Sequence, residues 1–335
     1  MTTIRYIAYS LCFLLFLAPN LLPAQEEKDD PTRWTPEDII FTEYLSSPRV
    51  SPDGQLVVWT KRRGDKEKDK FLNDLYLTHL DLEKDGAFRT IRLTNADEND
   101  SSPLFSRDGE TIYFLSSRDE GKKLWSLSIY GGEPEEVHEF EEGISDIAWL
   151  NDSTLTFVAE EGKTLYEQKL KEKKDNTVVV EDAEHWDADR VYTFSIKDKS
   201  IRRLTENEFP VRQYQASHDG RWLVYSLQMS PHYPVDGQPA PEYYLLDLEG
   251  GAPTQILEGL QTPGNFQFAA KDDGFYFTAD RSSDPEWNGA GITELYYFDL
   301  SEKSYVKIDL QWDWALGGGY EVVGEHVLAG LANGA

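Results

Sequence analysis

The pattern of apolar and polar positions is most regular over Ser101–Val137, where it predicts one small antiparallel sheet. Asp108-Gly109 predicts a tight turn, because glycine tolerates the positive φ that a hairpin needs. The run that follows, Thr111–Leu115 (TIYFL), is β-branched and aromatic, which is typical of a buried strand. Leu124–Tyr130 (LWSLSIY) alternates large apolar with small polar residues and predicts a strand with one buried face. A fourth, outer strand is expected to begin at Glu135.

The same order of turn and strands recurs along the chain. Further copies of the turn with its following strand are Ser47–Trp59, Tyr214–Tyr225, Phe266–Phe277 and a weaker Ile147–Phe157, which has Asn151-Asp152 in place of Asp-Gly. An alternating strand comes after each of them, at Leu75–Leu82, Leu124–Tyr130, Val191–Ile196, Tyr243–Leu248 and Leu295–Leu300. Short fourth strands are expected at Thr90–Leu93, Ile201–Leu204 and Thr254–Leu257.

These repeats favour an all-β fold, a β-propeller of four-stranded antiparallel blades. A unit with two apolar faces cannot bury both of them alone, so it must stack on copies of itself. A β-sandwich with coincidental Asp-Gly hairpins is the alternative, and it is disfavoured because sandwiches lack a repeating strand–turn–strand order. We expect blades at about 45–94, 101–137, 144 onward, 212–257 and 264–310.

The last stretch, Gly319–Leu331, resembles the first two strands of a sixth blade, and the sequence ends at Ala335. Closed propellers join their last blade to the first, which removes free strand edges. We therefore expect residues 45–335 to form an incomplete ring, with five blades and part of a sixth, in a fragment of a longer protein.

The N-terminus predicts export. Residues 1–24 combine the positive Arg5, the apolar run Ile7–Leu17 and a Leu-Pro-Ala end before Gln25, as in a cleaved signal peptide. A retained anchor is the alternative, but the apolar run is short for a membrane span. Cys12, the one cysteine, lies inside this segment, so the mature chain would have no disulfide. We expect a periplasmic or extracellular protein.

Residues 25–44 form a lead-in to the first blade. Trp34–Tyr44 (WTPEDIIFTEY) is expected to open with a short helix, with Thr35 as its cap and Pro36 at its first position. Within the first blade, the Arg62–Lys70 loop is highly charged and is expected to be solvated.

Two long loops occupy equivalent places in successive blades. Met229–Pro241 lies between the second and third strands of the fourth blade, and Ser282–Thr293 lies between those of the fifth. Such loops project from one face of a propeller, where a ligand or a partner domain usually binds. The alternative is that these loops merely vary in length.

Composition and net charge mainly exclude certain classes of binding partner. The net charge of −28 comes without any basic block, which disfavours nucleic acid and anionic membrane surfaces as partners. The acidity is accounted for by the solubility of an exported protein, and a specific cationic partner is the less favoured alternative. Aromatic residues make up 13% of the chain and suit the tightly packed faces between blades.

Motifs for chemistry are absent from the sequence. It has no Gly-x-Ser-x-Gly nucleophile elbow, no P-loop, no Gly-x-Gly-x-x-Gly and no His-Glu-x-x-His. Its histidines are scattered and are expected to be structural or solvated: His79, His138, His185, His218, His232 and His326. A serine triad is defined by geometry, so sequence alone does not exclude one. We expect no catalytic and no cofactor-binding residue.

Two acidic segments invite a metal interpretation. Asn95–Asp100 (NADEND) lacks the glycine and the distal glutamate of an EF-hand loop, so a solvated acidic turn is favoured. Glu184, His185, Asp187 and Asp189 lack a helical histidine pair or a cysteine partner. We expect no metal site, and the aspartates of the Asp-Gly turns are expected to shape those turns.

Several longer phrases resemble one known family. They are Trp34–Trp59, Thr164–Asp175, Leu295–Leu300 and Leu316–Gly334. They look like the propeller of bacterial serine peptidases of the prolyl oligopeptidase family (S9), in its acylaminoacyl-peptidase-like group. The phrases SPDG and FLSSRDEGKKLWSL are less specific, because they also occur in periplasmic TolB-type propellers.

The resemblance implies a function for the propeller. In that family a propeller, usually seven-bladed, covers a C-terminal α/β-hydrolase domain that carries the Ser-Asp-His triad, and it admits peptides while excluding folded proteins. This sequence lacks the hydrolase domain, so no catalytic residue can be carried over. The expected role is a non-catalytic, substrate-gating propeller of an exported peptidase, with that hydrolase domain and short peptides as partners. The alternatives are a TolB-like periplasmic binding propeller, and a propeller lyase or glycosidase with paired carboxylates in its channel.

Overall fold

A computed structural model of the chain describes residues 34–80, 88–118, 121, 123–141, 143–160, 173, 189–230, 232–282, 291–312 and 314–332. The predicted signal peptide over residues 1–24 lies outside these ranges, as do residues 161–172 and 174–188. No helix among the described residues is long and apolar enough to cross a membrane.

The described chain is almost entirely β-structure, in five four-stranded antiparallel sheets and one hairpin. The first sheet holds β1 (Tyr44–Val50), β2 (Leu56–Asp65), β3 (Lys70–His79) and β4 (Arg89–Arg92). The second holds β5 (Asp100–Phe105), β6 (Thr111–Ser116), β7 (Lys123–Ser128) and β8 (Glu135–Glu139). The third holds β9 (Ile144–Asn151), β10 (Thr154–Glu160), β11 (Asp189–Ser195) and β12 (Ile201–Arg203).

The C-terminal half repeats this plan. The fourth sheet holds β13 (Val211–Ala216), β14 (Trp222–Leu227), β15 (Glu242–Asp247) and β16 (Thr254–Ile256), with the short helix α4 (Tyr233–Asp236) between β14 and β15. The fifth holds β17 (Gln261–Phe268), β18 (Gly274–Arg281), β19 (Ile292–Asp299) and β20 (Ser304–Lys307). The hairpin is β21 (Leu316–Val323) with β22 (His326–Leu331).

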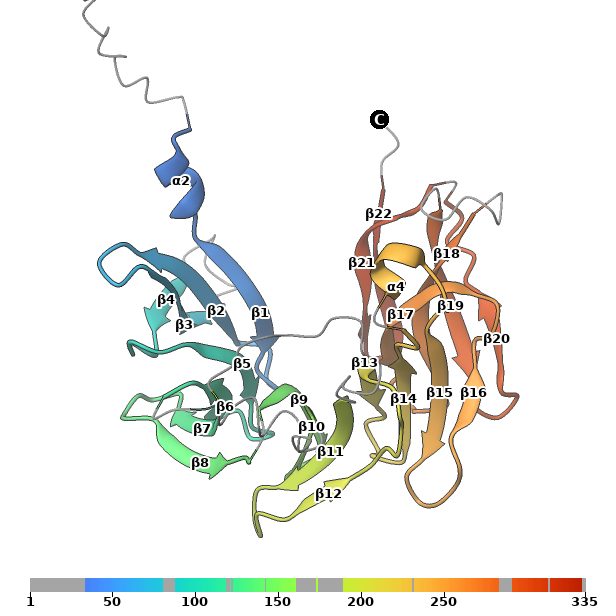
Figure 1. Cartoon of the computed structure of the whole chain (residues 1–335), viewed down its shortest axis with the longest axis horizontal. Coiled ribbons are helices and arrows are strands. Elements are labelled where there is room, and N and C mark those ends of the chain that lie inside the picture. Colours follow the sequence, from blue (N-terminus) through green and yellow to red (C-terminus); the bar gives the residue numbers. More distant parts are fainter. Residues whose placement is uncertain are drawn as a thin grey trace, which may run out of the picture.

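The sheets follow one another around an open arc, with the first strand of each on the inner side and the fourth on the outer side (Figure 1). The first sheet and the β21–β22 hairpin lie at the two ends of the arc. This arrangement confirms the predicted propeller of four-stranded antiparallel blades.

Each sheet carries an aromatic pair at one equivalent position of its second and third strands. The pairs are Trp59 with Tyr76, Phe114 with Trp125, Phe157 with Tyr192, Tyr225 with Tyr244 and Phe277 with Tyr296. In four of them the rings are stacked, with interplanar angles between 15° and 21°. These pairs define equivalent positions in the five sheets independently of loop length.

The core lies between successive sheets. Ile112 and Phe114 of the second sheet are fully buried against Val58 and Leu75 of the first, and similar apolar clusters join the second sheet to the third, the third to the fourth and the fourth to the fifth. Each large apolar side chain buried in this way contributes about 1.5–3 kcal/mol, so a sheet depends on its neighbours for stability.

The turns between first and second strands are held by a repeated serine–aspartate motif. In the second sheet, Ser106 Oγ donates to Asp108 Oδ1 over 2.5 Å and accepts from the Thr111 backbone N–H over 2.9 Å. The same bonds recur from Ser51 to Asp53 and from Ser217 to Asp219. The glycine after each of these aspartates has φ between 72° and 75°. The aspartates therefore shape the turns, as predicted.

The fifth sheet departs from the predicted turn. Asp272, not Gly274, takes the left-handed conformation, with φ 52°. The Asp272 backbone N–H donates to the Ala269 carbonyl over 2.9 Å, so the turn lies two residues earlier than the Asp273-Gly274 dipeptide indicated. Gly274 instead begins β18, where an added Cβ would lie 2.3 Å from the Phe298 carbonyl oxygen.

Two predictions about the N-terminal third have different outcomes. The short helix is confirmed as α2 (Pro36–Ile40), and Thr35 and Asp38 form a reciprocal capping box at its start. The predicted loop over Arg62–Lys70 is shorter than expected, because β2 continues to Asp65 and β3 begins at Lys70. Residues 66–69 form the turn and are exposed, as predicted. The backbone pairs across these strands, so the charged side chains there belong to a sheet.

Candidate functional site

The third strand of every sheet carries an ionisable residue two positions before its aromatic residue. These residues are Asp74, Lys123, Arg190, Glu242 and Glu294. Asp74, Lys123 and Glu294 are buried, and Arg190 and Glu242 are partly buried. A charge removed from water in this way needs a partner, so the pairing of each residue distinguishes its sheet from the others.

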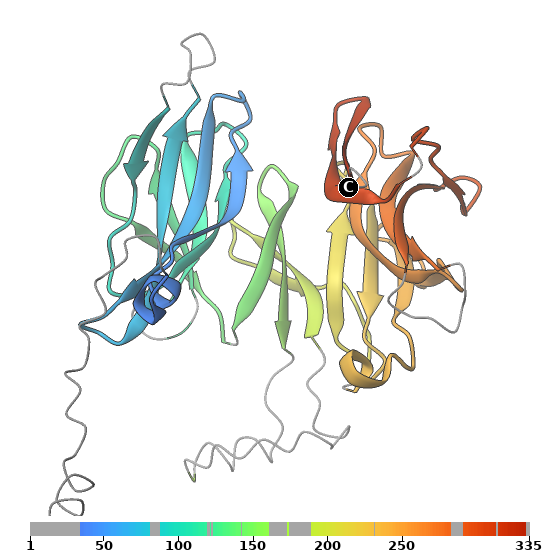
Figure 2. The ribbon, with the colours of Figure 1, turned by 90° about the horizontal axis from the view of Figure 1, so that it is seen from above.

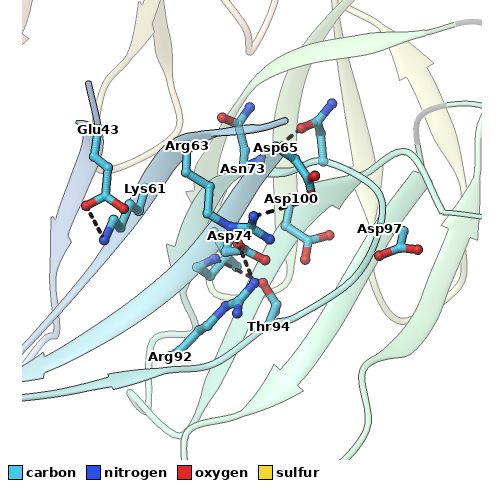
Figure 3. Close-up of polar contacts among 12 residues, drawn as sticks. Glu43, Lys61, Arg63, Asp65, Asn73, Asp74, Arg92, Thr94, Asp97 and Asp100 are labelled. Carbon is cyan, nitrogen blue, oxygen red and sulfur yellow. Dashed lines mark hydrogen bonds and ion pairs between the residues drawn. The ribbon is translucent and has the colours of Figure 1, made fainter. Parts of the chain in front are cut away.

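In the first sheet the carboxylate lies between two guanidinium groups (Figure 3). Asp74 Oδ2 accepts hydrogen bonds from Arg92 over 2.7 Å and from Arg63 over 3.3 Å, and the Asp74 side chain is almost fully buried. Arg63 comes from the end of β2, and Arg92 comes from β4. The two cations therefore approach the carboxylate from either side of β3.

The fifth sheet repeats this arrangement with different residues. Glu294 Oε1 accepts from Arg281 and Lys307 over 2.8 Å each, and Glu294 Oε2 accepts from the Tyr296 hydroxyl over 2.8 Å. Arg281 is the equivalent of Arg63, and Lys307 is the equivalent of Arg92. Burial would raise the pKa of the Glu294 carboxyl, but the hydrogen bonds from Lys307, Arg281 and Tyr296 outweigh it and lower the pKa to about 2.

The second sheet reverses the charges. Lys123 Nζ lies 3.2 Å from Glu136 and 3.5 Å from Glu139, both on β8. The hydrogen bond to Glu136 raises the pKa of the Lys123 ammonium group, so the lysine stays charged in its buried position.

The fourth sheet keeps the carboxylate but lacks the cations. Met229 stands where the first and fifth sheets have arginine, and Gln255 stands where they have Arg92 and Lys307. Glu242 Oε2 accepts one hydrogen bond of 2.5 Å from the Tyr244 hydroxyl. Burial and this bond raise the pKa of Tyr244 to about 12, so the hydroxyl remains a donor at neutral pH. No ion pair to Glu242 is formed by the residues that the structure describes.

A cavity of about 630 Å³ lies between the fourth and fifth sheets. Glu242 is among the residues that line it, although its carboxylate bonds to Tyr244, on the face of the fourth sheet that packs against the third. The polar lining of the cavity includes Glu242, Gln255, Glu258, Thr262, Asp280 and Thr293. Both long loops border it, through Gly237 and Pro241 of the first loop and Gly291 of the second. Residues 283–290 of the second loop lie outside the described residues, so its projection from the same face stays a prediction. Figure 2 shows α4, in the first loop, on the side of the arc opposite to the tip of the β21–β22 hairpin.

The wall of the cavity formed by the fifth sheet is organised around Asp280. The hydroxyls of Thr293 and Thr262 donate to its two carboxylate oxygens over 2.6 and 2.7 Å. Thr262 and Leu257, at the junction between the sheets, have φ of 46° and 59°. Side chains with a Cβ rarely adopt this backbone conformation, and such strain often accompanies ligand sites.

The acidic segment Asn95–Asp100 is largely the exposed acidic turn that its composition favoured, and only its last residue, Asp100, is buried. Asp97 pairs with Lys68, and Asp100 begins β5 with its side chain fully buried, where it accepts from Arg118 over 2.6 Å. The hydrogen bond and charge of Lys68 lower the pKa of Asp97. These carboxylates are already paired with cations of the chain.

The other metal candidate falls mostly outside the described residues. Glu184, His185 and Asp187 are not described, and Asp189 begins β11, where burial raises its pKa. Within the described ranges, no group of three or more His, Cys, Asp or Glu residues is placed to hold a metal ion.

The described histidines are spread over the arc. His138 stacks on Phe194 with ring centroids 4.8 Å apart, and burial lowers the pKa of its imidazole. His218 Nδ1 lies 2.8 Å from Asp272. The remaining described histidines lie at element ends: His79 at the end of β3, His232 before α4 and His326 at the start of β22.

The cavity residues Glu242, Gln255 and Asp280 were not singled out by motif searching. The signal that identifies them is a comparison of the repeats position by position, in which the cation partners of Glu242 are replaced. That comparison requires knowing which residues pair across neighbouring strands, because loops of unequal length separate the strands of each sheet.

Comparison with known proteins agrees with the fold. No family model matches the chain. The chain is 23% identical over 210 residues to the uncharacterized peptidase YuxL of Bacillus subtilis, an alignment that covers 58% of this chain and 31% of that protein. Acylaminoacyl peptidase of Pyrococcus horikoshii superposes with a TM-score of 0.58 at 16% identity, over 86% of this chain and 43% of the peptidase.

A second enzyme class shares the fold. Oligogalacturonate lyase of Vibrio parahaemolyticus superposes with a TM-score of 0.53 at 13% identity, over 82% of this chain and 67% of the lyase. The chain thus spans about one third of its curated peptidase relative and less than half of the P. horikoshii peptidase. Structural likeness at these identities shows the fold, and the likeness in sequence is to a peptidase.

Proposed function

We propose that this chain is the propeller portion of an exported serine peptidase and that it controls which substrates reach a hydrolase domain. The observation that carries the proposal is the sequence similarity to a peptidase over 58% of the chain, within the part that folds as propeller blades. In this proposal the chain has no catalytic residue of its own and acts on short peptides through its partner domain.

The physical basis of gating is a rigid opening. A disc that keeps its shape admits a flexible peptide and rejects a folded protein. Side chains of the inner strands bond across the sheet boundaries: Trp149 Nε1 donates to the Phe105 carbonyl over 2.6 Å. Between the fourth and fifth sheets, Gln213 donates to the Pro263 carbonyl and accepts from the Asn265 N–H, each over 3.2 Å. These bonds support the proposal, because they restrain hinge motion between blades.

The test uses the enzyme expressed from the natural gene. One cleavage sequence is presented twice, in a short peptide and in a surface loop of a stable folded protein. We expect the peptide to be cleaved and the folded protein to be spared until it is denatured. A gene that closes the ring without encoding a hydrolase, or equal cleavage of both substrates, would contradict the proposal.

A further inference from the structure

Four polar atoms are buried at the boundary between the first and second sheets without a hydrogen-bond partner among the described residues. They are Thr60 Oγ1 of β2, Asp100 Oδ1 of β5, Trp125 Nε1 of β7, and Arg118 Nε just beyond the end of β6. We propose that these atoms bind ordered water, which bridges the first sheet to the second.

The first step of the argument is that the two sheets turn these side chains toward each other. Thr60 lies two residues after Val58 in β2, so both point to the same face, and Val58 packs against the second sheet. Asp100 is paired with Ser116 across β5 and β6, and Ser116 lies two residues after Phe114, which packs against the first sheet. Thr60 and Asp100 therefore face one boundary from opposite sides.

The second step places the two nitrogen atoms. Trp125 belongs to the apolar cluster that the two sheets share. The guanidinium carbon of Arg118 lies 5.5 Å from the centre of the Trp125 ring, and Arg118 Nη2 donates to Asp100 Oδ2 over 2.6 Å. The start of β5 is held beside β3 because the Asn73 backbone N–H donates to Asn99 Oδ1 over 2.9 Å. The guanidinium group thus connects the indole ring with the carboxylate at this boundary.

The third step is burial. Thr60 and Asp100 are 3% and 0% exposed, and Trp125 is 8% exposed. A buried polar atom that has no partner is costly, and the great majority of such atoms in proteins bond either to protein groups or to ordered water. Four of them on one boundary indicate a common partner from the solvent.

The fourth step selects the kind of partner. The indole and guanidinium N–H groups can only donate, the ionised carboxylate of Asp100 can only accept, and the hydroxyl of Thr60 can do either. A cation would face two N–H donors and an anion would face a carboxylate, while Asp100 and Arg118 already neutralise each other. Water both donates and accepts, and buried waters typically make two to four hydrogen bonds to such groups.

The test is the sign of the stability change in Thr60→Val, which keeps the shape of the side chain and removes its hydroxyl. If Thr60 Oγ1 bonds to water, the substitution removes that bond, and we expect the equilibrium constant for unfolding in urea to rise about fivefold. If the hydroxyl has no partner, valine removes a buried polar group and stabilises the chain. An unchanged or smaller unfolding constant would overturn the proposal.

The matched control is Thr156→Val in the third sheet. Thr156 is fully buried, and its hydroxyl donates directly to the Ala148 carbonyl over 3.3 Å. Its replacement should raise the unfolding constant in the same direction as Thr60→Val. Opposite signs for the two substitutions would show that Thr60 lacks the partner that Thr156 has, and would refute the inference.

A crystal structure at a resolution that shows ordered water locates the site independently of stability. We expect the density of a water oxygen within about 3.2 Å of Asp100 Oδ1 and of at least one of the other three atoms. Direct bonding of Asp100 Oδ1 to another protein group, or the absence of water density beside it, would reject the bridge. Both measurements need no peptidase activity, so their outcome is separate from that of the size-selectivity test.

Discussion

The Nδ1 atom of His218 lies 2.8 Å from Oδ1 of Asp272, although the two residues belong to turns of neighbouring sheets. The same carboxylate accepts the backbone N–H groups of His218 and Asp219 over 3.0 and 2.8 Å. Asp272 is 8% exposed at its side chain, and its left-handed backbone directs the carboxylate across the boundary. This aspartate therefore ties the fourth sheet to the fifth.

Replacement of Asp272 tests this connection. Asp272→Ala removes three hydrogen bonds and places alanine at a positive φ, so we expect a loss of about 2–3 kcal/mol in the free energy of unfolding, measured by urea denaturation. Lys271→Ala is the matched control, because the Lys271–Glu325 pair is about 70% exposed on both sides and should contribute under about 1 kcal/mol. If the two substitutions lowered the free energy of unfolding equally, Asp272 would not be the residue that connects the fourth sheet to the fifth.

The charge cluster of the fifth sheet predicts a pH dependence. The Glu294 pKa is lowered from 4.5 to about 2 in the folded chain, so its contribution to stability is present above pH 4.5 and is lost as the pH falls toward 2. Comparison of wild type with Glu294→Gln should show a stability difference that is constant near neutrality and shrinks over that window. A difference that is independent of pH down to 2 would show that the pairing is not electrostatic.

Substituting alanine at the equivalent aromatic positions is expected to lower the free energy of unfolding by different amounts. Phe114 and Phe277 are fully buried between sheets, whereas the equivalent Trp59 lies on the face of the first sheet turned away from the second and is only partly buried. We expect Phe277→Ala to cost about 3–5 kcal/mol and Trp59→Ala less than half of that, by thermal or urea unfolding. A similar loss of unfolding free energy at both positions would mean that the face of the first sheet that carries Trp59 is covered in solution.

The ends of the arc predict self-association. Leu45 is 70% exposed on the edge strand β1, and Leu328 is 61% exposed on β22. Exposed apolar edge strands pair readily with other chains. Sedimentation velocity should reveal concentration-dependent association that Leu45→Lys together with Leu328→Lys reduces. A chain that stays monomeric at high concentration, with or without these changes, would disprove the expectation.

The repeating blades could be predicted from sequence because their signals are local. Ser106 and Asp108 bond to backbone groups at most five residues away, so their turn is readable from a single stretch. The shifted turn at Asp272 was not readable in this way, because its aspartate is fixed by bonds to a different sheet. Local motifs thus predict that a blade is present, whereas contacts with the neighbouring sheet determine at which residue its turn lies.

The candidate site was hidden from sequence for a related reason. Asp100 and Arg118 are 18 residues apart, and Arg63 and Asp74 are 11 apart, so their pairing depends on strand register. A charged run such as Arg62–Lys70 looks like one loop until the paired strands show that only residues 66–69 form the turn. Glu242 becomes informative only once Met229 and Gln255 are known to occupy the places of Arg63 and Arg92.

We propose that this propeller gates a peptidase and does not cut peptides itself. The most direct measurement is fluorophosphonate labelling of the purified chain, read by mass spectrometry beside hydrolysis of peptide p-nitroanilides. We predict that no serine is labelled and that no p-nitroaniline is released above the uncatalysed rate. A labelled serine, with hydrolysis that the label abolishes, would contradict the central claim.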